Sequence, residues 1–176
     1  MNFSEYQRSV HQFADYPSAM VNGNEVKLVY PVFGLVEEIG EAREKLRAVE
    51  ECDDLPRMTS FMKELGDVCW FCAEILTTLG FEADLSRFTD DSSDDFELAY
   101  PEISGIMAKA VRDNDGIISP EKALIVKEKI EVIVWTVSEM AKKVCMSDLE
   151  TVMQINYDKL LSRKKRGVIH GSGDDR

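Results

Sequence analysis

Four carboxylates in this chain have the spacing of a metal site. Glu38 and Glu41 are three residues apart, and so are Glu64 and Asp67. Residues three apart on an α-helix lie on one face, so two such helices packed side by side would direct four carboxylates to one place. Close carboxylates repel one another unless a cation lies among them, and oxygen ligands of this kind suit Mg²⁺ or Mn²⁺. The spacing therefore predicts a divalent-metal site in a helical bundle, where the metal would meet a phosphate.

Helical periodicity extends along most of the chain. The segments that fit a 3.6-residue period lie near 2–16, 31–50, 58–80, 97–114, 120–145 and 148–165. Ser119 and Pro120 predict the N-cap and the first position of the fifth segment, and Asp115-Gly116 predicts the turn before it. No run alternates for long enough to predict a sheet. We therefore expect an all-α helical bundle.

The length of 176 residues suits a single domain with a sizeable core. The acidic stretch 82–98 contains four aspartates and two serines within 90–95, which predicts a solvated, mobile linker. The segment 147–176 is a basic C-terminal helix and tail. The linker thus separates two helical halves, 31–81 and 99–146.

The two halves share a weak internal repeat. KELGDVCW places Trp70 after the second acidic pair, and KEKIEVIVW places Glu128, Glu131 and Trp135 in the same arrangement. We therefore interpret the chain as two fused helix-pair repeats. Because 99–146 keeps one acidic pair only, we expect 31–81 to hold the metal and the degenerate second half to complete the bundle. Glu128 and Glu131 are accordingly expected to be surface acids.

The composition excludes several classes of partner. A net charge of −12 disfavours binding to nucleic acid and to anionic membranes, and no apolar run is long enough for a membrane helix. The N-terminal segment is expected to be an amphipathic, charged helix rather than a signal peptide. The four cysteines stand among apolar neighbours and are expected to be reduced core thiols, which favours a cytoplasmic location: Cys52, Cys69, Cys72 and Cys145.

The paired acids and the C-terminal segment together resemble a known family. Glu38-x-x-Glu41, then 22 intervening residues and Glu64-x-x-Asp67, resembles the all-α nucleoside triphosphate pyrophosphohydrolases called MazG-like. The C-terminal signature of bacteriophage and bacterial members is matched by Asn156, Lys159, Arg163, Arg166-Gly167 and Gly171 to Arg176. The opening SEYQRSV, with Gln7, is similar to the first helix of the family. The chain departs from short members by its linker and second helix pair, an arrangement that resembles the all-α dUTPases.

The resemblance implies an activity and a set of ligands. The activity is Mg²⁺-dependent cleavage of a nucleoside or deoxynucleoside triphosphate to the monophosphate and pyrophosphate, with Mn²⁺ as a possible substitute. Glu38, Glu41, Glu64 and Asp67 would hold one or two metals. Glu41 is the expected general base for the attacking water, and Glu37 is the next candidate.

Substrate contacts follow from the same resemblance. Lys159 and Arg163 share a helix face and would bind pyrophosphate oxygens, while Asn156, one turn back, could reach the nucleotide. Trp70 could stack on a base, although packing between helices is favoured, and Gln7 could bond a base edge. A homodimer or homotetramer is expected in the cytoplasm, which for a phage protein is that of the host.

Alternatives stay open at this point. Paired acids are often only a solvated helix face, and His11 and His170 are expected to be ordinary surface residues. A second functional class is a non-catalytic nucleotide-binding or regulatory bundle, because the second half shows that ligands can be lost in this chain.

Overall fold

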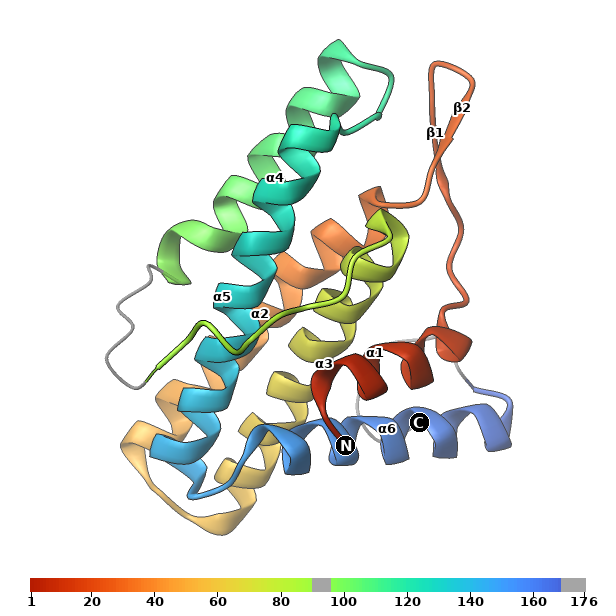
Figure 1. Cartoon of the computed structure of the whole chain (residues 1–176). Helices are drawn as coiled ribbons and strands as arrows, with labels where there is room; N and C mark the ends of the chain where they lie inside the picture. The colour runs from red at the N-terminus through yellow and green to blue at the C-terminus, as the bar shows by residue number, and fades with distance from the viewer. Residues whose placement is uncertain (90–95, 169–176) are drawn as a thin grey trace.

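Long helices make up most of the computed structural model, which describes residues 1–89 and 96–168 (Figure 1). The elements in chain order are α1 (Phe3–Val10), a 3₁₀ turn (His11–Phe13), β1 (Ala19–Val21), β2 (Asn24–Val26), α2 (Val29–Glu51), α3 (Leu55–Leu79), α4 (Phe96–Asp113), α5 (Pro120–Cys145) and α6 (Leu149–Arg166). The prediction of a mainly helical fold is confirmed. The Gly171–Arg176 signature and the aspartates of 90–95 lie outside the described residues.

The helix ends follow local sequence signals. The Ser119 side chain accepts a hydrogen bond from the backbone N–H of Lys122, and Pro120 opens α5, as predicted. The first helix is shorter than the predicted 2–16. It begins at a capping box formed by Asn2 and Glu5 and ends at Val10, where the 3₁₀ turn follows. Pro17 disfavours helical backbone at Tyr16, so a helix as far as residue 16 was not to be expected.

A short β-hairpin between α1 and α2 was not predicted. Its strands have three residues each, too few to show alternation, but Asn22 and Gly23 both have positive φ, as in a type I′ turn. Asn22 Nδ2 donates a 2.7 Å hydrogen bond to Asp115 Oδ1 in the turn between α4 and α5. The expectation of no sheet is therefore wrong for this segment, because the turn chemistry and a tertiary contact stabilise strands of minimal length.

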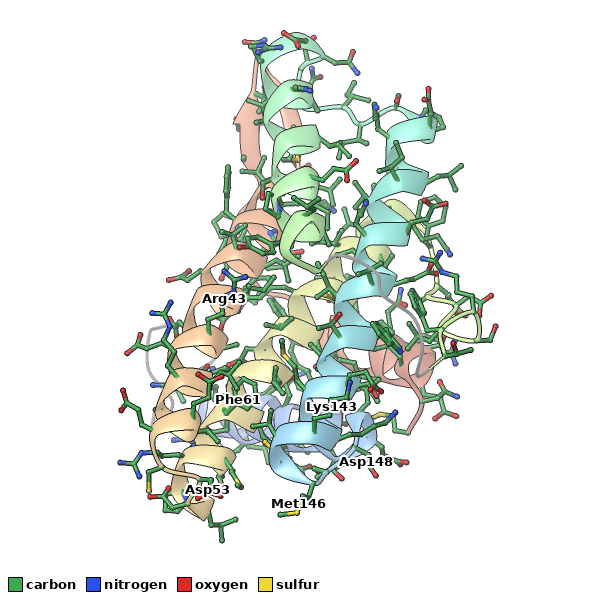
Figure 2. All side chains as sticks on the ribbon, turned by 90° about the vertical axis from the view of Figure 1, so that its left-hand side faces the viewer. Arg43, Asp53, Phe61, Lys143, Met146 and Asp148 are labelled. Carbon is green, nitrogen blue, oxygen red and sulfur yellow. The ribbon has the colours of Figure 1, made fainter. Side chains whose placement is uncertain are left out.

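Two antiparallel helix pairs form the body of the bundle. α2 packs on α3, α4 packs on α5, and the pairs meet through α3 with α5 and α2 with α4. Figure 2 shows Asp53, between α2 and α3, at the same end as Met146 and Asp148, between α5 and α6. Gly34 allows α2 to approach α3, because a Cβ there would lie 2.2 Å from the Phe71 ring.

Helices α1 and α6 lie across α3, and they pack on each other and on α3 (Figure 1). The two ends of the described chain thus meet on the helix that carries Glu64 and Asp67. Among the described residues, no helix is long and apolar enough to cross a membrane.

Part of the expected acidic linker is packed against the bundle. The backbone N–H of Asp84 donates a 2.7 Å hydrogen bond to Glu131, and the Phe88 ring stacks on Trp135 with 5.5 Å between centroids. Glu131 is 2% exposed and forms ion pairs with Lys127 and Arg87. Residues 82–89 therefore differ from the solvated linker that the composition predicted, and Glu131 is not a surface acid; Glu128 is exposed, as expected.

The cysteines follow the expectation in part. All four are free thiols, and Cys69 and Cys72 are fully buried. Burial raises the pKa of both thiols, so they behave as core residues. Cys145 is half-buried, but Cys52 is exposed just after the end of α2, which corrects its prediction as a core thiol.

Candidate metal centre

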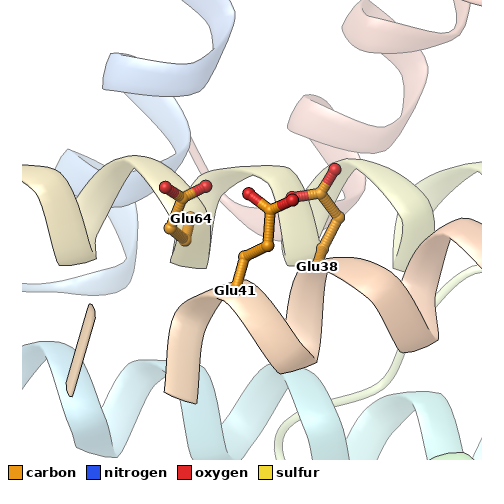
Figure 3. Close-up of side chains that lie close together, drawn as sticks. All are labelled: Glu38, Glu41 and Glu64. Atoms are coloured by element: carbon orange, nitrogen blue, oxygen red, sulfur yellow. The ribbon is translucent and has the colours of Figure 1, made fainter. Parts of the chain in front are cut away.

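Three of the four predicted ligands meet between α2 and α3. Glu38 and Glu41 project from α2 and Glu64 projects from α3 towards them (Figure 3). One carboxylate oxygen of each lies within 4.8 Å of the others. The spacing of three residues places two acids on one face of α2, and the antiparallel packing of α3 brings the third opposite.

The oxygens suit a small divalent cation. Ligand oxygens of an octahedral Mg²⁺ with bonds of about 2.1 Å lie roughly 3.0 to 4.2 Å apart. The separation within the group is close to this range, so small rotations of the exposed Glu41 and the half-buried Glu38 would complete it. The all-oxygen donor set also fits Mg²⁺ or Mn²⁺.

The electrostatics of Glu38 point the same way. Burial, followed by the charges of Asp67, Glu41 and Glu64, raises the pKa of Glu38 to about 8, and Lys159 opposes this shift. Burial and three neighbouring carboxylates thus disfavour the ionised form of Glu38, and a bound divalent cation would favour it.

Asp67 is not part of the three-carboxylate group. Asn156 Nδ2 donates a 2.7 Å hydrogen bond to Asp67 Oδ1, and the Lys159 ammonium forms an ion pair with Oδ2. Its charge nevertheless acts on Glu38, so the fourth predicted ligand lies beside the group with both oxygens bonded to α6.

A tyrosine that sequence reasoning missed completes this contact. The Tyr6 hydroxyl on α1 donates a 2.7 Å hydrogen bond to Asn156 Oδ1, and both side chains are fully buried. Gly66 makes the approach of α6 possible, because a Cβ there would lie 2.8 Å from Asn156 Cβ. In the sequence, Tyr6 is only one more apolar position of an amphipathic helix.

The other residues predicted to bind phosphate or base, or to act as the base, lie in different surroundings. Lys159 is nearly buried at Asp67, and Arg163 lies one turn further along α6. Asn156 is buried with both ends of its amide bonded inside the protein, which is not the position expected for direct contact with a nucleotide. Glu37 is exposed on α2 and lies outside the three-carboxylate group.

Trp70 belongs to an aromatic group one turn beyond Asp67. Its ring meets Tyr16 edge-on with 6.2 Å between centroids and Phe71 with 4.7 Å, and Tyr16 stacks on Tyr30 at 4.7 Å. The indole Nε1 of Trp70 is buried without a hydrogen-bond partner in the described part of the chain. Trp70 thus packs between elements, the arrangement that was favoured over stacking on a base.

Gln7 does not lie near the three-carboxylate group. Its amide nitrogen donates to the carbonyl oxygen of Phe81 at 2.7 Å and to Thr77 Oγ1 at 3.2 Å. Thr77 is ten residues after Asp67, about 15 Å along α3. Gln7 therefore joins α1 to the C-terminal end of α3.

His11 is more than an ordinary surface residue. Its Nδ1 lies 3.1 Å from Glu74 Oε2, and the Tyr16 hydroxyl donates to the same oxygen at 3.3 Å. Glu74 is fully buried, and burial raises its pKa while His11 opposes the shift. The only sequence signal was Glu74 itself, an acid seven residues after Asp67 and hence on the same face of α3. His170 lies outside the described residues.

Comparison with known proteins gives one partial match. The chain is similar to a bacteriophage protein. Over 75 residues it is 41% identical to the Gene 37 protein of Mycobacterium phage L5, and this stretch covers 43% of the chain and 65% of the relative. The chain thus spans just under two thirds of the length of that relative. No family model matches the chain, and no solved structure matches it. Membership of the MazG-like family stays a prediction.

Proposed function

We propose that this chain is a Mg²⁺-dependent nucleotide pyrophosphohydrolase of the MazG-like type, which cleaves a nucleoside or deoxynucleoside triphosphate to the monophosphate and pyrophosphate. The observation that carries the proposal is the convergence of Glu38, Glu41 and Glu64 from two helices, next to Lys159 on a third. Acids that bind metal beside a cation that binds phosphate are what phosphoryl chemistry requires, because most of the catalysis is positioning and charge neutralisation.

Each residue at the centre has a role in this proposal. Glu38, Glu41 and Glu64 hold Mg²⁺, with Mn²⁺ accepted by the same oxygens, and Asp67 is the fourth ligand. When bound there, the metal would neutralise charge on phosphate oxygens and would make a water easier to deprotonate. Glu41 is the most exposed of the three grouped carboxylates, so it is best placed to take the proton of the water; Glu37 is the next residue to test.

The substrate would lie along α3 and α6. Lys159 and Arg163 bind the pyrophosphate oxygens. The aromatic group at Trp70, Tyr16 and Tyr30 supplies ring faces for a base, since stacking on an aromatic side chain is the common sequence-tolerant mode of base binding. A homodimer or homotetramer in the cytoplasm remains part of the proposal through the family resemblance.

Product analysis tests the reaction directly. The protein is incubated with each common nucleoside and deoxynucleoside triphosphate and Mg²⁺, and the products are separated. The matched control is the double variant Glu38→Gln/Asp67→Asn, which removes two negative charges with little change in shape. Monophosphate and pyrophosphate from the wild type, and not from the control, are the expected result.

The same experiment separates the two functional classes. If no nucleotide is turned over while Mg²⁺ and a nucleotide still bind, the non-catalytic regulatory bundle replaces the enzyme. If the double variant turns over nucleotide as fast as the wild type, the acid group is not the active site.

A further inference from the structure

The carboxylate of Asp67 meets two side chains of different kinds on α6. Oδ1 accepts from a neutral amide, Asn156, at 2.7 Å, whereas Oδ2 is paired with a cation, Lys159. The two contacts come from adjacent turns of α6, so one carboxylate is held between a neutral partner and a charged one.

The contact between Asp67 and Asn156 is held in place by Tyr6. The Tyr6 hydroxyl donates to Asn156 Oδ1 at 2.7 Å, and this bond sets the amide so that its NH₂ group faces Asp67. Tyr6 and Asn156 are fully buried. Gly66 leaves room for the Asn156 side chain, because a Cβ at residue 66 would lie 2.8 Å from Asn156 Cβ. A side chain held in this way cannot leave without an unsatisfied buried polar group.

The contact between Asp67 and Lys159 is partly exposed and therefore less fixed. The Lys159 side chain is 10% exposed and that of Asp67 is 18% exposed, so this contact borders solvent. A lysine ammonium is a compact charge on a flexible stem of four carbons, and it can move by rotation of that stem alone. The oxygen that it covers belongs to the carboxylate whose charge acts on Glu38.

We propose that Lys159 is an internal substitute for the metal on Asp67: it leaves Oδ2 when a divalent cation binds the acid group, while Tyr6 and Asn156 keep Asp67 in place during the exchange. This inference rests on the metal site of the proposed function. In the exchange the carboxylate of Asp67 loses a singly charged partner, the Lys159 ammonium, and gains a share of a doubly charged one.

The exchange couples two binding events. Without metal, Lys159 is bonded to Asp67 and is not available to a phosphate. After exchange, the ammonium is released next to the site where the phosphates would lie. Metal and triphosphate therefore favour each other's binding, and the coupling is reciprocal.

Calorimetric titration with Mg²⁺, without nucleotide, tests the proposal. Lys159→Met removes the competing ammonium and keeps the stem, so we expect Mg²⁺ to bind at least about fivefold more tightly, within the usual range of coupling. Lys164→Met removes the same charge from the same helix, where the ammonium bonds Gln12 instead, and should change the affinity less than about twofold.

Tyr6→Phe should act in the opposite direction. Loss of the hydroxyl frees the Asn156 amide to turn, and removal of a group that orients a ligand typically weakens metal binding about 10- to 100-fold. Tyr157→Phe is the matched control, because this residue follows Asn156 on α6 and its ring packs on Phe13. The thermal melting of each variant is measured without metal, so that a folding defect is recognised.

A second measurement uses the unaltered protein. In ¹⁵N-edited spectra of the lysine ammonium groups, the signal absent from Lys159→Met identifies Lys159, and Mg²⁺ should shift or remove it in the wild type. Unchanged or weaker Mg²⁺ binding by Lys159→Met, or a Lys159 signal indifferent to Mg²⁺, overturns the exchange. No Mg²⁺ binding by the wild type overturns the metal site itself, and the exchange with it.

Discussion

Asn156 of α6 donates a 2.7 Å hydrogen bond to Asp67 of α3, across 89 residues of sequence. Through Tyr6 the same amide is joined to α1. Three helices from the beginning, middle and end of the chain therefore determine the position of one carboxylate. A substitution that alters the packing of α6 on α3 should therefore change both the geometry of the acid group and the stability of the protein.

Gly66→Ala should destabilise the protein. The added methyl group would lie 2.8 Å from Asn156 Cβ and 3.3 Å from the Val152 carbonyl oxygen, and such overpacking costs about 1–3 kcal/mol. Gly40→Ala is the matched control on α2, because nothing lies within 4 Å of its added Cβ; it should stabilise by roughly 0.5–1 kcal/mol. Urea unfolding of both variants gives the two free energies, and equal effects would contradict the packing of α6 on Gly66.

Mg²⁺ should raise the melting temperature. At a concentration about 100 times Kd, binding to the folded state adds about 2.7 kcal/mol, which for a chain of this size corresponds to roughly 5–10 °C. Differential scanning calorimetry with and without Mg²⁺ measures the shift, and Glu38→Gln/Asp67→Asn should abolish it. If neither millimolar Mg²⁺ nor Mn²⁺ changes the melting of the wild type, the metal site is wrong.

The metal-free protein should lose stability as the pH rises. The pKa of Glu38 is raised from 4.5 to about 8 in the folded state, so between these values the folded state holds a proton that the unfolded state has released. The contribution of this proton to the free energy of unfolding is complete below about pH 4.5 and is lost as the pH rises through 8. Glu74, whose pKa burial also raises, acts in the same direction.

Melting temperatures measured from pH 5 to 9 in the presence of a chelator check this dependence. Glu38→Gln should flatten the decline without removing it, because Glu74 remains. Saturating Mg²⁺ should also flatten it, since the cation replaces the proton at the acid group. A decline that is equally steep in all three samples would show that Glu38 does not titrate in this range.

Nucleotide binding should be visible in the fluorescence of one tryptophan. The chain has two, Trp70 and Trp135, and Trp135 stacks on Phe88 in the other helix pair. A base that stacks on the aromatic group should quench Trp70 in Trp135→Phe. The reciprocal variant Trp70→Phe should give no quenching by nucleotide, and quenching in that variant instead would place the base in the second half.

Local sequence determined the long helices and the two acidic pairs. Helices α2, α3 and α5 follow from periodicity, with a side-chain cap at the start of α3 and of α5. Glu38 and Glu41 share a face because three residues make almost one turn. The meeting of these acids with Glu64 could be anticipated, since adjacent antiparallel helices joined by a short connection must pack on each other.

Tertiary structure decided which polar groups are paired. The local sequence does not distinguish Glu131, which is bonded to the segment 82–89, from the exposed Glu128. It also does not show that Gln7 reaches the end of α3 while Tyr6 reaches Asn156. The reason is physical: periodicity reports which face of a helix is apolar, whereas a buried hydrogen bond or ion pair depends on a partner far along the chain. For the same reason the sequence alone determined that Asp67 lies on the same face of α3 as Glu64. Only the packing of α6 on α3 gave Asp67 its partners Asn156 and Lys159.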